Sequence, residues 1–378
     1  MKNNLILKIA LLSCCFVTAS VNAVAGNIPA MAEAFPEVPL SLIELLTTIP
    51  SLLSMTAVLF SSKIASSLGY KKTVLAGCLL SAVSGTLPLL LKNVYLILFC
   101  RAIFGFGCGL ISSSLLILIV YFFQGEERSR MIGLQGSAGG LASMITAFIA
   151  GRLLVFGWNI SFLVYLFGFM VFLLVLFFIP HVGSIRTSSA NTDNSLIKSK
   201  TSLYATGILM FIAVLSATLF VIKCASLATE KNITAEGTGS LLVMCISGGS
   251  LIAGMIYGTM KQKLKFLSLP VFFLICAAGF FLASVSHNIV LLAIASFILG
   301  FGYLAFVPYL QESVSAFGTS GTTVILVFQG LGAFAAPYLG TALELFTSNL
   351  SGQFIATGGI FLILMVLGFF FAKKEQGA

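Results

Sequence analysis

Charged side chains are scarce in this sequence of 378 residues. Only 8% of the residues are charged, whereas 59% are hydrophobic, and the mean hydropathy is +1.11. A soluble domain carries roughly 25% charged residues, so these few charges cannot cover a water-facing surface of this size. Lipid must therefore be the solvent for much of the chain, and the composition predicts an integral membrane protein.

Other absences exclude several classes of function. The chain has only two histidines, His181 and His287, and its eight cysteines form no Cys-x-x-Cys pair. We therefore expect no metal, haem or disulfide framework. No phosphate loop of the Gly-x-x-x-x-Gly-Lys type is present, so the chain contains no ATP-driven motor. Paired intramembrane acids and a histidine cluster are also missing, and we predict no enzymatic activity and no cofactor.

Long apolar runs fill most of the chain. They are about 20 residues long and do not alternate, so they predict membrane-spanning helices and exclude a β-barrel. We predict an all-α membrane protein with twelve transmembrane helices in two pseudo-symmetric six-helix bundles. The expected spans are residues 6–28, 42–60, 73–91, 94–122, 131–151, 160–180, 203–223, 238–258, 266–286, 288–310, 320–345 and 354–372.

One polar stretch, residues 181–202, is typical of a linker. It predicts an N-terminal bundle over 1–180, a cytoplasmic central loop over 181–202 and a C-terminal bundle over 203–378. Fifteen of the twenty basic residues lie on one side of this topology and four on the other, which places both termini and the central loop in the cytoplasm. The net charge of +9 therefore indicates topology and not a nucleic-acid partner. We expect a monomer in the plasma (cytoplasmic) membrane.

The two predicted halves share a sequence repeat. The pattern Lys92-Asn93, Arg101, Gly105-Phe106-Gly107 and Gln135-Gly136 recurs as His287-Asn288, Ser296, Gly300-Phe301-Gly302 and Gln329-Gly330. Both halves have the same predicted number of spans and the same orientation, so they are parallel repeats related by an axis along the membrane normal.

Arg101 is the most informative candidate residue, because it lies inside an apolar run. An arginine at mid-membrane costs about 3 kcal/mol on insertion scales, so it normally faces the bundle interior or a wet cavity. Helical spacing puts it on one face with Gly105, Cys108 and Ser112. Two interpretations fit this position: a helix-locking or snorkelling arginine, and a residue for substrate binding or coupling.

The remaining candidates are polar residues within or beside the spans. Glu44, near the outer end of the second span, is read either as a proton carrier or as an interfacial acid. Lys223 and Glu312 lie at span ends, where an interfacial role is favoured over a functional one. Neutral residues that could line a cavity, or pack helices together, are Asn22, Asn27, Gln135, Thr146 and Gln329.

Two motifs resemble those of the major facilitator superfamily. In the loop between spans two and three, Gly69, Lys71 and Lys72 match the family pattern, although serines replace its first glycine and its acid. In the fourth span, Arg101, Gly105 and Gly107 match an arginine followed by spaced glycines. The resemblance implies alternating access by two rocking bundles, with the 2–3 loop as a conformational element and Arg101 in coupling.

A weaker likeness points to bacterial twelve-span efflux permeases. Of their fifth-span motif Gly-Pro-x-x-Gly-Gly, only Gly151 is present in this chain. The following Gly157-Trp158-Asn159 resembles the Gly-Trp-Arg that continues the motif. The expected function is proton-coupled, secondary active export of small apolar or amphipathic molecules. The alternatives are an importer or facilitator of a small metabolite and, more remotely, a non-transporting membrane receptor or enzyme.

Overall fold

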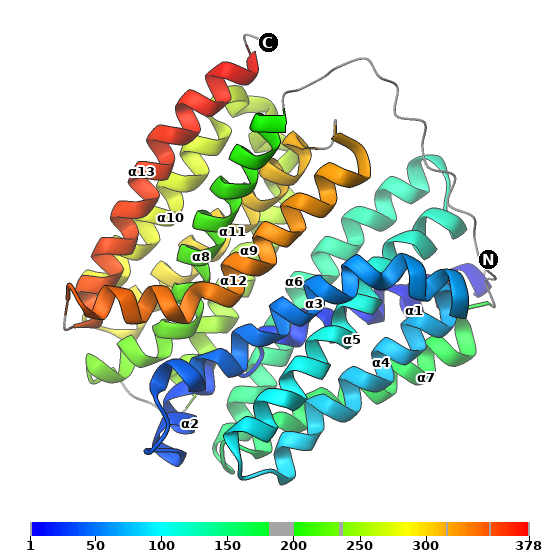
Figure 1. The fold of residues 1–378 in the computed structure, drawn as a ribbon, viewed down its shortest axis with the longest axis horizontal. Coiled ribbons are helices and arrows are strands. Elements are labelled where there is room, and N and C mark those ends of the chain that lie inside the picture. The colour runs from blue at the N-terminus through cyan, green and yellow to red at the C-terminus, as the bar shows by residue number, and fades with distance from the viewer. Residues whose placement is uncertain (1, 181–199, 234–236, 315–316, 348, 377–378) are drawn as a thin grey trace. The chain divides into compact units, whose positions relative to one another are not determined.

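The structure, a computed structural model, describes residues 2–180, 200–233, 237–314, 317–347 and 349–376 (Figure 1). Its regular elements are α-helices and short 3-10 helices, and none of the described residues lies in a strand. Within the described ranges, eleven segments are long and apolar enough to cross a membrane, and one of them, residues 238–285, contains two successive α-helices. Each of the twelve predicted spans therefore has a helical counterpart, and the predicted fold class is confirmed. The predicted central loop lies almost wholly outside the described residues.

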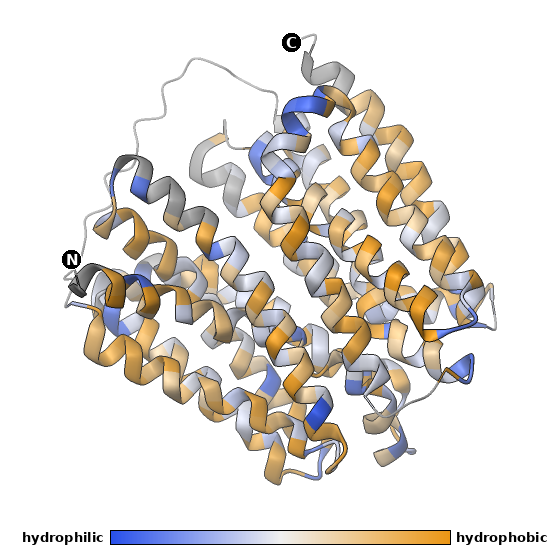
Figure 2. Ribbon diagram, turned by 180° about the vertical axis from the view of Figure 1, so that it is seen from behind, coloured by the Kyte–Doolittle hydropathy of each residue, from blue (hydrophilic) through white to orange (hydrophobic). Residues whose placement is uncertain are grey.

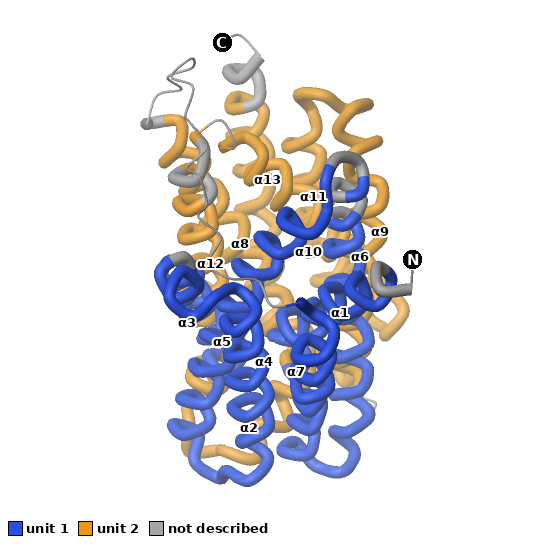
Figure 3. Tube along the Cα trace, turned by 90° about the vertical axis from the view of Figure 1, so that its right-hand side faces the viewer, with its two compact units in different colours: residues 1–24, 45–193 blue, residues 25–44, 194–378 orange. Residues whose placement is uncertain are grey.

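Contacts divide the chain into two compact units (Figure 3). Unit 1 comprises residues 1–24 and 45–193. Its helices are α1 (Lys2–Ala19), η1 (Ser20–Asn22), the later part of α3 (Leu40–Leu68), α4 (Tyr70–Thr86), η3 (Leu87–Leu90), α5 (Val94–Phe122), α6 (Gly125–Leu154), η4 (Ile160–Leu166) and α7 (Phe167–Phe178).

Unit 2 comprises residues 25–44 and 194–378. Its helices are η2 (Ala25–Asn27), α2 (Ile28–Ala34), the first turn of α3, α8 (Lys200–Glu230), α9 (Thr238–Leu264), η5 (Lys265–Leu267), α10 (Ser268–Val285), α11 (Ile289–Ser313), α12 (Gly318–Glu344) and α13 (Leu350–Gln376). Hydrophobic residues dominate the helices of each unit, and hydrophilic residues gather near helix ends and connections (Figure 2).

The repeat begins each time with an asparagine that caps a helix. The side chain of Asn93 accepts hydrogen bonds from the backbone N–H groups of Tyr95 and Leu96 at the start of α5. Asn288 does the same for the N–H of Leu291 at the start of α11, at 2.8 Å. An asparagine in this place satisfies N–H groups that the first turn of a helix leaves free.

The glycines of the repeat bring the same pairs of helices together in both units. A Cβ atom at Gly105 of α5 would overlap the backbone of Pro50 in α3, and one at Gly300 of α11 would overlap the backbone of Ile246 in α9. Only a residue without a side chain permits so close an approach. The sequence repeat is therefore also a repeat of helix packing.

One boundary differs from the predicted division into residues 1–180 and 203–378. Residues 25–44 group with unit 2 and not with the rest of the N-terminal half (Figure 3). A Cβ atom at Gly26 would overlap the backbone of Gly239 and Ser240, so the two segments touch through their main chains. Composition alone contains no signal for this contact, because short stretches of small residues occur throughout the chain.

Candidate functional site

Arg101 lies at the centre of a hydrogen-bonded cluster in unit 1, and its side chain is fully buried. Its Nε donates to the carbonyl of Leu46 at 2.8 Å, and its Nη2 donates to the carbonyl of Val21 at 2.7 Å. Its Nη1 donates to the hydroxyl of Tyr165 at 2.8 Å, and that hydroxyl donates to the carbonyl of Ser20 at 3.3 Å. We call these five residues the Arg101 cluster. Each of the three guanidinium nitrogens of Arg101 therefore donates a hydrogen bond to a protein atom.

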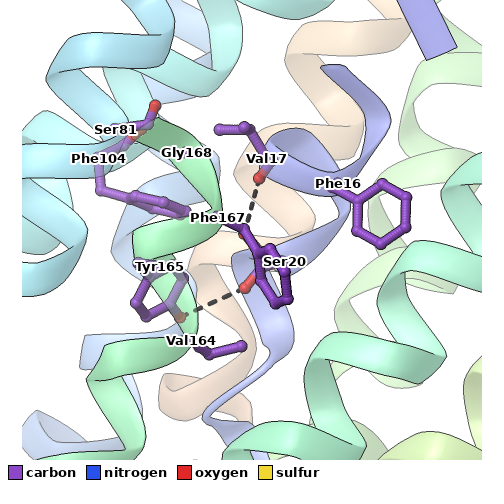
Figure 4. A pocket seen from close by; sticks show the side chains of 9 residues that line it. All are labelled: Phe16, Val17, Ser20, Ser81, Phe104, Val164, Tyr165, Phe167 and Gly168. Carbon is purple, nitrogen blue, oxygen red and sulfur yellow. Dashed lines mark hydrogen bonds between the residues drawn. The ribbon is translucent and has the colours of Figure 1, made fainter. Parts of the chain in front are cut away.

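Aromatic rings complete the surroundings of Arg101. The guanidinium carbon lies 4.8 Å from the ring centroid of Phe104 and 5.3 Å from that of Tyr165, which allows cation–π attraction. Tyr165 fits because Gly85 has no side chain, since a Cβ there would lie 2.8 Å from the tyrosine ring. Beside the cluster is a cavity of about 10 Å³, close to the room that one water molecule needs (Figure 4).

The second cluster lies in unit 2 and is built around Lys223 of α8. The Lys223 ammonium is 3.1 Å from Oε1 of Glu44 at the start of α3, and 3.2 Å from Oε1 of Glu344 at the end of α12. The side chains of Lys223 and Glu44 are 2% and 1% exposed, whereas that of Glu344 is 49% exposed. These three residues form the Lys223 cluster, in which one buried ammonium contacts one buried and one half-exposed carboxylate.

The Lys223 cluster differs from the sequence interpretation in two ways. Lys223 was favoured as an interfacial residue because it lies at a span end, but its ammonium is buried and paired. Glu344 was not singled out at all. A weak signal existed, because Gly340 lies one helical turn before Glu344, and a Cβ at Gly340 would lie 2.9 Å from Cε of Lys223. That glycine leaves the space in which the lysine extends.

The neutral candidates are spread over both units. In unit 2, Oδ1 of Asn27 accepts a hydrogen bond from Ser240 at 2.9 Å, and Gln329 accepts one from Gln311 at 3.0 Å. In unit 1, the backbone carbonyl of Gln135 accepts a weak hydrogen bond from the Cys15 thiol at 3.6 Å. Asn27 thus joins η2 to α9, and Gln329 joins α12 to α11.

Three further candidates have local roles in the structure. Thr146 is buried and donates to the carbonyl of Ala142 in its own helix, and Asn22 is exposed. Glu312 forms an ion pair with Lys261 and accepts a hydrogen bond from the Tyr257 hydroxyl at 3.1 Å. None of these three residues contacts the Arg101 or Lys223 cluster through a described hydrogen bond.

The loop between α3 and α4 is a sharp turn at Gly69. Its φ of +84° is a conformation that favours glycine, and the residue ends α3 and begins α4 without an intervening linker. Lys71 donates to the carbonyl of Leu176 near the end of α7 at 2.8 Å, and Lys72 is exposed. A cation at this place also interacts favourably with the negative end of the α7 dipole.

Comparisons with known proteins agree with the twelve-helix architecture. Residues 10–337 match the sequence profile described as Major Facilitator Superfamily. No curated protein sequence matches the chain. Among solved structures, a mutant of the peptide transporter POT in complex with alafosfalin aligns with a TM-score of 0.75 and 13% identity, over 98% of this chain and 94% of that one. A second structure of the same mutant aligns with the same TM-score of 0.75 at 12% identity, over the same shares of both chains.

At this level of identity, the structural likeness establishes the fold alone, whereas the family match extends over most of the chain. The described spans establish an integral, multi-pass membrane protein. The chain therefore belongs to the Major Facilitator Superfamily and is a secondary transporter, not an enzyme.

Proposed function

We propose that the protein is a proton-coupled exporter of small apolar or amphipathic molecules, in which Glu44 carries the proton. The observation that supports this most is the buried contact between Lys223 and Glu44, with Glu344 beside it. Both termini face the cytoplasm in this proposal, and the protein works in the plasma membrane by alternating access.

The chemistry of the Lys223 cluster favours a switch driven by protonation. Two buried charges are stable only while they are paired, because each loses its hydration on burial. When Glu44 accepts a proton, its negative charge disappears and Lys223 needs another counter-charge. Glu344 lies 3.2 Å away and can take over that contact. Proton binding therefore loosens the tie between the start of α3 and α8 without leaving a buried ammonium unpaired.

The distribution of buried charge favours substrates that carry no strong fixed charges. Arg101, Glu44 and Lys223 are the only Arg, Lys, Asp or Glu side chains that are buried among the described residues. Each is already bound to protein atoms, so a charged substrate group would have to displace one of these contacts. A free peptide carries two terminal charges, and the likeness to the peptide transporter therefore leads us to keep peptide uptake as the competing function.

Transport by purified protein in liposomes tests the proposal. The panel contains a neutral apolar dye, a lipophilic cation and dialanine, each followed with and without an imposed pH gradient. We expect the dye or the cation to move against its own gradient only when the pH gradient is present. Uptake of dialanine together with protons would establish the importer instead, and movement independent of pH would remove the coupling.

Variants connect the transport result to Glu44. Glu44→Gln should retain binding of the transported molecule but lose gradient-driven movement, because it cannot exchange a proton. Glu37→Gln is the matched control, since Glu37 is an exposed acid of the same segment, residues 25–44. Gradient-driven transport by Glu44→Gln at the wild-type rate would show that the proton is carried elsewhere.

A further inference from the structure

Two backbone carbonyls in unit 1, those of Leu46 and Val21, lack the hydrogen bond that a regular α-helix would give them. Pro50 lies inside α3 and has no N–H, so the carbonyl of Leu46, four residues earlier, has no helical donor. In the first span, α1 ends at Ala19, and 3-10 turns follow before α2 begins at Ile28. The carbonyl of Val21 lies in this interrupted stretch. In a bilayer, no water is available to such groups, and each must be satisfied by the protein.

Arg101 donates to both of these carbonyls. Its Nε reaches Leu46 at 2.8 Å and its Nη2 reaches Val21 at 2.7 Å. Its third nitrogen binds Tyr165, whose hydroxyl donates to the carbonyl of Ser20 in the same interrupted stretch. The planar guanidinium presents donors in several fixed directions at once, which a lysine ammonium cannot match.

We propose that Arg101 is a positioning residue, which replaces the backbone hydrogen bonds that Pro50 and the break in the first span remove from the carbonyls of Leu46 and Val21, and which the hydroxyl of Tyr165 holds in place. Leu46 and Val21 lie just beyond the two ends of residues 25–44, at the points where the chain leaves and re-enters unit 1. Arg101 thereby joins the two stretches of unit 1 that precede and follow this segment. A guanidinium stays protonated in proteins, so it acts here by donating hydrogen bonds and not by carrying the transported proton.

The contact between Arg101 and the Leu46 carbonyl can be tested with a double-mutant cycle. In Pro50→Ala the new backbone N–H can bind the Leu46 carbonyl, so this carbonyl no longer depends on Arg101. Arg101→Gln should therefore lower the unfolding temperature of the purified protein in both backgrounds, but less in Pro50→Ala, where only the contacts with Val21 and Tyr165 are lost. Arg152→Gln, which removes an exposed arginine of the same unit, is the matched control and should change little in either background. Additive effects of Arg101→Gln and Pro50→Ala would overturn the proposal.

Hydrogen exchange locates the effect along the chain. In Arg101→Gln, peptides covering residues 17–27 and 44–52 should exchange roughly tenfold faster or more, while peptides of unit 2 from residue 200 onward remain unchanged. Tyr165→Phe, which keeps the ring, should accelerate exchange only in the first of these regions. If Arg101→Gln proves too unstable to purify, Arg101→Lys and Tyr165→Phe carry the same test, because each retains part of the hydrogen bonding. Wild-type exchange in these regions would refute the positioning role.

Transport separates this role from proton coupling. Arg101→Lys should lower the maximal rate without moving the pH at which transport is half-maximal, because the titrating group is unaffected. A shift of that pH together with unchanged hydrogen exchange would assign Arg101 to coupling and overturn our inference. This result is independent of Glu44, since loss of coupling in Glu44→Gln leaves the predicted exchange behaviour of Arg101 variants in place.

Discussion

The buried pair of Lys223 and Glu44 leads to a prediction about stability that separates charge pairing from simple packing. Three variants are compared: Glu44→Gln, Lys223→Met and the double replacement. Each single variant removes one charge and leaves the other buried. The double variant removes both charges and keeps side chains of similar volume.

The structure sets the expected magnitudes. At the 3.1 Å separation of Lys223 and Glu44, an effective dielectric constant of 20 gives an attraction of about 5 kcal/mol. Glu344 is 49% exposed, and solvent screening reduces its contribution to about 1 kcal/mol. Glu44→Gln should therefore cost about 2–4 kcal/mol, since Glu344 replaces only part of the lost attraction. The double variant should lie within about 1 kcal/mol of the wild type, because it also removes the desolvation of two charges.

Thermal unfolding in detergent measures this difference. A unit of this size shifts its midpoint by roughly 2–4 °C per kcal/mol, so Glu44→Gln should melt on the order of 10 °C below the wild type. The double variant should melt close to the wild type yet remain inactive in gradient-driven transport. A double variant as unstable as the worse single variant would refute the reasoning, because it would show that shape and not charge pairing governs this site.

Three further perturbations follow from the packing of the helices. Gly105→Ala should lower the unfolding temperature or block folding, because its Cβ would overlap the Pro50 backbone, and expression with thermal unfolding checks this. Gly69→Ala should cost about 1–3 kcal/mol, since alanine disfavours a φ of +84° with a ψ of +147°, whereas Gly136→Ala, with open space around its Cβ, should not destabilise. Lys231→Met should accelerate hydrogen exchange at the end of α10, because the ammonium donates to three carbonyls there. Wild-type behaviour of Gly105→Ala, Gly69→Ala or Lys231→Met would contradict the packing described.

Sequence patterns predicted the fold because each span carries its own signal. Length and hydropathy define a span locally, and the paired Asn93 and Asn288 mark the same helix start in each half. Arg101 and Glu44 could also be identified as candidate site residues from the sequence, because a charged side chain inside an apolar run costs free energy and usually has a function. These features depend on residues close together in the chain.

The partners of those residues could not be predicted in the same way. The contacts of Lys223 with Glu44 and Glu344 join three helices that are far apart in the sequence, and their rotation about their own axes is set by packing. Tyr165 gave no signal, since a tyrosine near a span end is common at membrane interfaces. The acceptors of Arg101 were hidden for another reason. Two of them are backbone carbonyls, and only Pro50 indicated that one of these would lack a helical donor.

The Arg101 cluster also bears on the order in which the chain can assemble during synthesis. Val21 and Leu46 precede Arg101, so both carbonyls are already in the bilayer when α5 enters it. Tyr165 follows 64 residues later, in η4, and can join only after α6 has been synthesised. The first two spans thus already supply hydrogen-bond acceptors for an arginine whose insertion into lipid alone is unfavourable. Insertion of α5 should therefore depend on the helices before it, and a ribosome-bound chain that ends before η4, and so lacks Tyr165, should already hold Arg101 in place.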